Sequence, residues 1–135
     1  MALQYSVTVR NAQLDAFESA IGTDAVLKIR TGSVPASCAD ADSGTVLATI
    51  TLPSDWMLDA SGGTKSKSGT WSDTSADATG TAAHWRLYAS DGTTCHMQGT
   101  ATATGGGGDM TLDNTSIASG QTITITGFSI TAGNS

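Results

Sequence analysis

Two histidines and a cysteine lie close together in the chain and could contribute to a metal site: His84, Cys95 and His96. Zinc sites need three or four such ligands that converge on one point. The histidines are expected on one face of a hairpin and Cys95 on the other, with no carboxylate beside them. We therefore expect no metal site here.

Pairs of carboxylates are the second candidate for chemistry. Asp40 and Asp42 alternate as at the opening of a calcium loop, but the bidentate acid expected further along is absent. Asp and Ser also favour turns without any ion, so we expect a turn. A hydrolase needs one carboxylate in a desolvated pocket, and the Ser- and Thr-rich segments around the other candidates predict solvated loops. These other candidates are Asp73 with Asp77 and Asp109 with Asp113.

The four glycines at 105–108 lack the Lys and Ser or Thr that follow the glycines of a phosphate-binding loop. No nucleophile elbow is visible in the sequence either. We therefore expect a protein that is not an enzyme and that uses no cofactor.

Composition and charge exclude further classes. The 135 residues carry a formal net charge of −6, with only six Lys and Arg in total. So few scattered cations cannot form a footprint for nucleic acid or for an anionic membrane. Neither a signal peptide nor an apolar stretch of bilayer length is apparent, so we expect synthesis in a reducing cytoplasm. Cys38 and Cys95 are then expected as free thiols, with a disulfide as the alternative.

One helix is expected to precede the strands, over residues 6–21. Apolar residues recur there at spacings of three and four, and Gly22 follows as a helix-ending residue. The expected apolar stripe consists of Val7, Arg10, Leu14, Phe17 and Ile21. Polar residues fall largely on the other faces: Asn11, Gln13, Asp15, Glu18 and Ser19.

Short strands are expected over most of the remaining chain. Residues 25–30 and 45–52 alternate in polarity, whereas residues 60–69 read as a flexible run that holds two lysines. In the last strand, 121–131, apolar positions change phase at Gly127, which predicts a β-bulge.

The segment 82–102 predicts a hairpin around Asp91-Gly92. A three-residue loop pairs Leu87 with Met97 and Ala89 with Cys95, which gathers the apolar residues on one face. The opposite face is then polar, and Tyr and Arg are common anchors of protein interfaces. It comprises His84, Arg86, Tyr88, His96 and Gln98.

The expected fold is all-β: an antiparallel β-sandwich, jelly-roll-like, with one N-terminal α-helix. Residues 1–22 would form an arm and the helix, and 23–135 the sandwich, within a single domain. Three tryptophans could form a sugar-stacking platform, but with so few aromatic residues we expect at least two in the core. They are Trp56, Trp71 and Trp85.

Both ends of the chain resemble small structural proteins of tailed bacteriophages. The similarity lies in ALQYSVTVRNAQLDAFESAIG and DMTLDNTSIASGQTITITGFSIT, with a weaker match in GTAAHWRLYASDGTTCHMQGT. These phage proteins are similar in turn to capsid decoration, or cement, proteins with a sandwich or jelly-roll core. The resemblance implies a protein made in the host cytoplasm that joins the virion at the capsid surface.

The resemblance also implies partners, namely the major capsid protein and copies of the chain itself as a dimer or trimer. A tail or fibre module that recognises host glycans is the alternative. The candidate contact residues lie in the arm, the helix and the polar hairpin face: Tyr5, Val7, Arg10, Leu14, His84, Arg86, Tyr88, His96 and Gln98.

Overall fold

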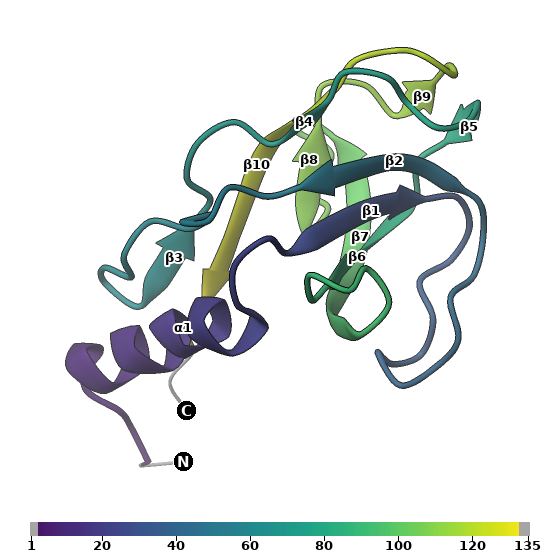
Figure 1. The fold of residues 1–135 in the computed structure, drawn as a ribbon. Helices are drawn as coiled ribbons and strands as arrows, with labels where there is room; N and C mark the ends of the chain where they lie inside the picture. The colour runs from purple at the N-terminus through teal and green to yellow at the C-terminus, as the bar shows by residue number, and fades with distance from the viewer. Residues whose placement is uncertain (1–2, 133–135) are drawn as a thin grey trace.

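The computed structural model describes residues 3–132. Residues 1–2 and 133–135, the outer ends of the expected arm and sandwich, lie outside the described residues. The described chain is mostly β with one helix (Figure 1). The elements are α1 Val7–Ile21, β1 Val26–Arg30, β2 Val46–Thr51, β3 Thr64–Ser66, β4 Ser72–Asp73, β5 Gly80–Thr81, β6 His84–Tyr88, β7 Cys95–Ala103, β8 Met110–Leu112, β9 Ser116–Ile117 and β10 Ile123–Thr131.

Helix α1 ends at Ile21 as the sequence predicts and begins at Val7, one residue after the expected start, with Ser6 as its N-cap. The Ser6 side chain accepts a hydrogen bond from the backbone N–H of Val9, as N-cap residues do. At the other end Gly22 has a φ of 88° and donates its N–H to the carbonyl of Glu18. Among the described residues no helix is long and apolar enough to cross a membrane.

The main sheet has eight strands and curls into a mixed half-barrel (Figure 1). Its order is β2-β1-β6-β7-β8-β10-β3, with β4 paired to β10, while β5 and β9 form a separate pair. The expected jelly-roll-like antiparallel sandwich is not confirmed, because β7 and β8 run parallel. The glycine run makes this possible: the loop 104–109 returns the chain to the level of Ala101 before β8 starts.

Two local predictions about register are tested by the strand pairs. The predicted bulge in the last strand is confirmed, since the β10–β8 register shifts between Ile125 and Gly127. The hairpin pairs Leu87 with Met97 as predicted. The expected pair of Ala89 with Cys95 is wrong, because a second register shift follows Leu87 and places Cys95 opposite Tyr88. This shift moves Cys95 to the other face of the sheet.

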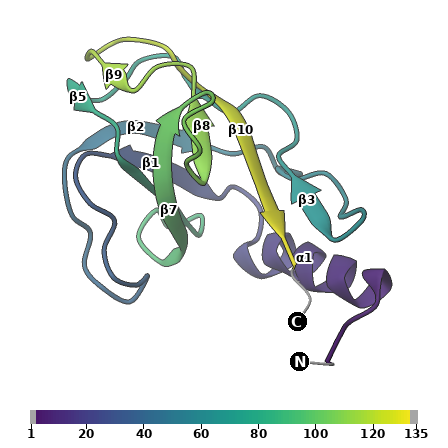
Figure 2. The same ribbon diagram turned by 180° about the vertical axis from the view of Figure 1, so that it is seen from behind.

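The core fills the inside of the curled sheet. The rings of Trp56 and Trp71 lie 6.1 Å apart, Trp71 and Phe128 5.7 Å, and Trp85 and Phe128 5.3 Å. All three tryptophans are buried, as expected for at least two of them. Figure 2 shows from behind how β10 runs past β8 and ends beside α1.

Candidate functional site

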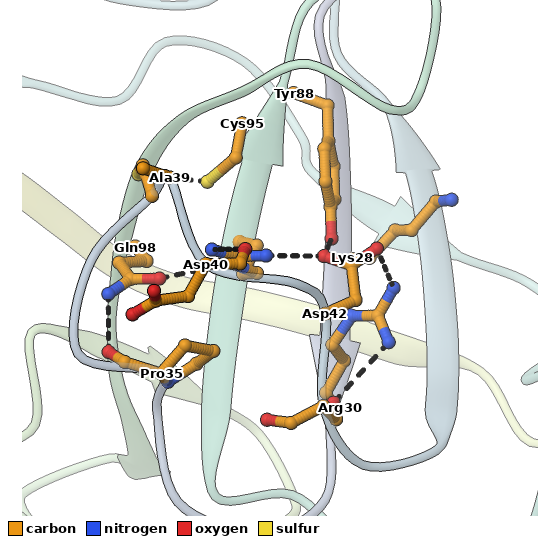
Figure 3. A network of polar contacts seen from close by, with 12 residues as sticks. Lys28, Arg30, Pro35, Ala39, Asp40, Asp42, Tyr88, Cys95 and Gln98 are labelled. Atoms are coloured by element: carbon orange, nitrogen blue, oxygen red, sulfur yellow. Dashed lines mark hydrogen bonds and ion pairs between the residues drawn. The ribbon is translucent and has the colours of Figure 1, made fainter.

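The polar face of the β6–β7 hairpin is covered by the loop that joins β1 to β2. This loop, residues 31–45, folds back over the sheet, where Figure 3 shows its Asp42 beside Tyr88. His84, Arg86 and Tyr88 are all buried, and each bonds to a residue of the loop. Arg86 is only 1 % exposed. The open polar face that the sequence predicts is therefore not observed for these three residues, because the chain's own loop occupies it.

Arg86 holds the loop in place through both Nη atoms of its guanidinium group, while Nε bonds the neighbouring strand β7. Nη1 donates to Oδ1 of Asp42 at 2.5 Å, and Nε donates to Oε1 of Gln98 at 3.0 Å. Nη2 donates to the backbone carbonyls of Ser37 at 2.9 Å and Asp40 at 3.1 Å. These bonds offset the free-energy cost of burying the positive charge of Arg86.

Asp42 is the acceptor at the centre of this network. Its Oδ1 also accepts the Tyr88 hydroxyl at 2.6 Å, and its Oδ2 lies 3.1 Å from Nη2 of Arg30 (Figure 3). Burial alone would raise the pKa of Asp42, but the hydrogen bonds from Tyr88 and Arg86 and the two arginine charges outweigh it and lower the pKa. The carboxylate is therefore held ionised.

The pKa values of Arg86 and Tyr88, which both bond to Asp42, are raised. Burial would lower the pKa of Arg86, but the hydrogen bond to Asp42 and the nearby anions raise it. Burial and the hydrogen bond to Asp42 both raise the pKa of Tyr88. The arginine thus remains charged and the tyrosine neutral at ordinary pH.

Of the predicted hairpin face, His96 and Gln98 are less buried than Arg86, Tyr88 and His84. His96 is exposed at the register shift, and Gln98 is half-buried, donating Nε2 to the Pro35 carbonyl at 2.6 Å. His84 is buried, and its Nδ1 lies 2.7 Å from the Gly32 carbonyl. A second subunit could reach the buried members of this face only if the loop moved.

Apart from Asp42, which pairs with Arg30 and Arg86, the acidic residues considered for chemistry accept hydrogen bonds from the chain's own backbone or hydroxyl groups. Asp40 accepts the N–H of Ser37, as expected for a turn. Within residues 3–132 no group of three or more His, Cys, Asp or Glu is placed to hold a metal ion. The remaining candidates accept hydrogen bonds from nearby strands: Asp73 and Asp77 from Thr49, Asp109 from Thr100, and Asp113 from Thr124.

Helix α1 docks on the sheet through polar side chains. Lys65 of β3 is 1 % exposed, and its Nζ lies 2.7 Å from Oδ1 of Asp15 and 3.3 Å from Oε1 of Glu18. Asn11 accepts the N–H of Gly63 at 2.9 Å. The polar helix face thus contacts the sheet, and the run 60–69, which the sequence suggests to be flexible, contains strand β3.

At this junction the cation of Lys65 and the carboxylate of Asp15 each stabilise the charged form of the other. Burial would lower the pKa of Lys65, but hydrogen bonds to Asp15 and Glu18 raise it. The pKa of Asp15 is lowered, first by the hydrogen bond from Lys65 and then by that from the Ala60 N–H. A stripe of Asn11, Asp15 and Glu18, spaced four and three apart, was the signal in the sequence that could have revealed this docking face.

Leu14 and Ile21 of α1 are buried, but other apolar side chains of the arm and helix remain at the surface. Within residues 3–132 the exposed large hydrophobic residues are concentrated in the arm and the helix. Phe17 is 44 % exposed, whereas Leu14, of the same expected stripe and a candidate contact residue, is buried against the chain's own sheet. The exposed residues are Leu3, Tyr5, Val7, Val9 and Phe17, with Leu58 outside this segment.

A groove of about 800 Å³ lies beside the same helix. Leu14 and Phe17 line it from α1, and Met97, Phe128 and Ile130 from the sheet. Arg10, a predicted contact residue, is half-buried and donates Nε to the Ala132 carbonyl at 2.8 Å. The exposed residues of the arm and helix, together with this groove, are called the apolar helix surface below.

Comparisons of the chain with protein family models, with curated proteins and with solved structures find no match.

Proposed function

We propose that this chain is a non-enzymatic decoration, or cement, protein of a tailed-phage capsid. It would bind the lattice of the major capsid protein, together with further copies of itself, and so stabilise the head. It would be made in the host cytoplasm and end at the capsid surface. The resemblance of both chain ends to phage structural proteins supports this proposal, as does the β-rich fold, on which a jelly-roll-like sandwich remains a finer hypothesis.

The observation that carries the proposal is the apolar helix surface. Grouped exposed apolar residues often mark sites of protein contact. Of the six exposed large hydrophobic residues in the part of the chain that the structure describes, five fall within residues 3–17. The helix is already tied to the sheet through Lys65 and the buried Leu14 and Ile21, so its exposed apolar side chains are left for a partner.

The mechanism would be thermodynamic linkage. A protein that binds the expanded shell, and not the contracted or dissociated one, stabilises the expanded shell by its binding free energy. Such an interface needs to bury about 1,000 Å² or more in total to be specific. The groove beside Phe17 would contribute the concave part of that contact.

The glycan-binding alternative depends on exposed aromatic rings. Trp71 and Tyr88, its natural candidates, are both buried. We therefore propose the capsid role alone.

The first test is the composition of purified virions. A decoration protein should occur in numbers comparable to the major capsid protein, and a few copies per particle would contradict the proposal.

The second test adds purified protein to shells that lack it. The double variant Val9→Ser/Phe17→Ser should lose binding, whereas Leu58→Ser should retain it, because Leu58 is exposed but lies outside the arm and helix. Unchanged unfolding midpoints would show that both variants remain folded.

A further inference from the structure

Two cysteines that are distant in the sequence meet under the 31–45 loop. Cys38 lies in that loop and Cys95 begins β7, 57 positions later. Their sulfur atoms are 2.8 Å apart. A disulfide bond requires about 2.05 Å, so a small rotation of the two side chains would bring the sulfurs within bonding distance.

The backbone holds both cysteines in this arrangement. The register shift after Leu87 turns Cys95 toward the loop, on the same face as Arg86. Arg86 in turn binds the carbonyls of Ser37 and Asp40, on either side of Cys38. The two thiols are therefore positioned by interactions that do not depend on a bond between them.

We propose that Cys38 and Cys95 are the site of an intrachain disulfide that forms under oxidising conditions and fastens the 31–45 loop to β7. This inference is independent of the proposed capsid role, because it rests on the loop and the hairpin alone. The oxidant would be a small disulfide such as oxidised glutathione. A cavity of about 530 Å³ opens beside Cys38, Cys95 and Arg86 and provides access to the sulfurs.

The reaction would proceed in two exchanges. The Cys38 thiolate attacks one sulfur of oxidised glutathione, which forms a mixed disulfide and releases one glutathione thiolate. The Cys95 thiolate then attacks the Cys38 sulfur and releases the second glutathione. The two cysteines lose two electrons and their two thiol protons, and one glutathione disulfide becomes two glutathione thiols.

The order of attack follows from the surroundings of Cys95. Burial, and then the hydrogen bond and charge of Cys38, raise the pKa of Cys95 to about 12. Because the thiolate is the nucleophile, Cys95 is the poorer first attacker. Once Cys38 carries glutathione, its sulfur lies next to Cys95, and proximity favours closure of the ring over a second exchange with solvent glutathione.

The bond would restrict the unfolded chain and hold the loop over Arg86. It closes a long segment, and disulfides across long segments remove more freedom from the unfolded state. The oxidised protein should therefore melt at a higher temperature than the reduced protein. Proteolytic cleavage within residues 31–45 should be slower after oxidation.

The decisive experiment is thiol counting on the wild-type protein. Fully reduced protein is incubated with oxidised glutathione, denatured, and analysed for free thiols and for intact mass. We expect both thiols to disappear, the mass to fall by two hydrogens, and a non-reduced peptide map to join the peptides of Cys38 and Cys95. Two remaining thiols, a stable glutathione adduct, or dimers linked between chains would overturn the proposal.

Single substitutions test which cysteine attacks glutathione first and which one closes the disulfide. Cys95→Ser should stop at a glutathione adduct on Cys38, because the second attacking sulfur is missing. Cys38→Ser should react more slowly, because the remaining thiol is that of Cys95, whose pKa is raised by partial burial. Cys38→Ser/Cys95→Ser should show no change of melting temperature on oxidation, and a shift as large as that of the wild-type protein would also contradict the proposal.

Discussion

Arg86 and Asp42, 44 positions apart in the chain, form an ion pair with 2.5 Å between Nη1 and Oδ1. This pair joins a strand in the middle of the main sheet to a loop that is otherwise mostly exposed. The loop therefore covers the hairpin because one buried cation needs the acceptors that the loop supplies.

Replacing Asp42 by Asn should destabilise the protein clearly. The substitution leaves the charges of Arg30 and Arg86 buried without a carboxylate. Asp42 itself is 40 % exposed, so we expect the free energy of unfolding to fall by about 2 kcal/mol, which is less than for a fully buried pair. Urea unfolding measures the change. Asp40→Asn is the matched control: Asp40 is exposed and caps a turn through the N–H of Ser37, so its loss should be about 0.5 kcal/mol. Equal losses would show that Asp42 has no special role.

Replacing Lys65 by Met should loosen the helix. The apolar side chain fits the buried site but leaves the carboxylates of Asp15 and Glu18 without their cation. We expect a loss of about 1–2 kcal/mol, together with faster amide exchange in α1 than in the sheet. Lys67→Met is the control, because the Lys67 Nζ donates to the Gly69 carbonyl and lies over the Trp71 ring rather than beside a carboxylate, and the stability should fall by about 0.5 kcal/mol. Uniformly faster exchange in both variants would argue against a docking role for Lys65.

The two ends of the 31–45 loop each contain a glycine, and these two glycines form a matched pair for substitution. Both Gly44 and Gly32 have positive φ, at 71° and 81°. A Cβ atom at Gly44 would lie 1.9 Å from the carbonyl oxygen of Thr31, whereas one at Gly32 meets nothing within 4 Å. Gly32→Ala should therefore cost about 1 kcal/mol from backbone strain alone. Gly44→Ala should cost about 3 kcal/mol or more, because the backbone must also move. Similar unfolding midpoints for the two variants would refute this difference.

Stability should fall at acid pH because of the carboxylates. The pKa values of Asp42 and Asp15 are lower in the folded than in the unfolded chain. Their contribution is fully present above the unfolded value of about 3.9 and is lost as the pH falls through the lower, folded values. Urea midpoints measured from pH 6 to pH 2 should show this decline. In Asp42→Asn the decline should be shallower, and an unchanged slope would contradict the assignment.

Stability should also fall at alkaline pH, for the opposite reason. The pKa values of Tyr88 and Lys65 are raised in the folded chain. Their contributions are present below the unfolded values of about 10.0 and 10.4, and are lost as the pH rises through the folded values. Phenolate absorbance of Tyr88→Phe, subtracted from that of the wild type, isolates the titration of Tyr88. A midpoint at or below that of free tyrosine would be the contrary result.

Local features of the fold were predictable because each depends on a few neighbouring residues. Ser6 and Gly22 mark the ends of the helix through their own hydrogen bonds and dihedral angles. The pair Leu87 with Met97 follows from burying one face of the hairpin, and the bulge at Gly127 follows from the change of apolar phase. The glycine run was also recognisable as a loop, although the parallel pairing of β7 with β8 that it permits was not.

The contacts across the chain were not predictable in this way. A buried Lys65 and an exposed Phe17 reverse the usual preferences of their residue types. Each is explained only by what lies opposite: Asp15 and Glu18 for the lysine, and an open groove for the phenylalanine.

The amino-acid sequence alone determined that this is a small acidic protein, mostly β, with one capped helix and a hairpin of known central register. Only the tertiary structure decided which polar groups are covered. Arg86 lies in a strand whose alternation suits either solvent or a partner, and its burial depends on Asp42, far along the chain. A hydrogen bond depends on distance and direction in space, which spacing along the sequence does not record.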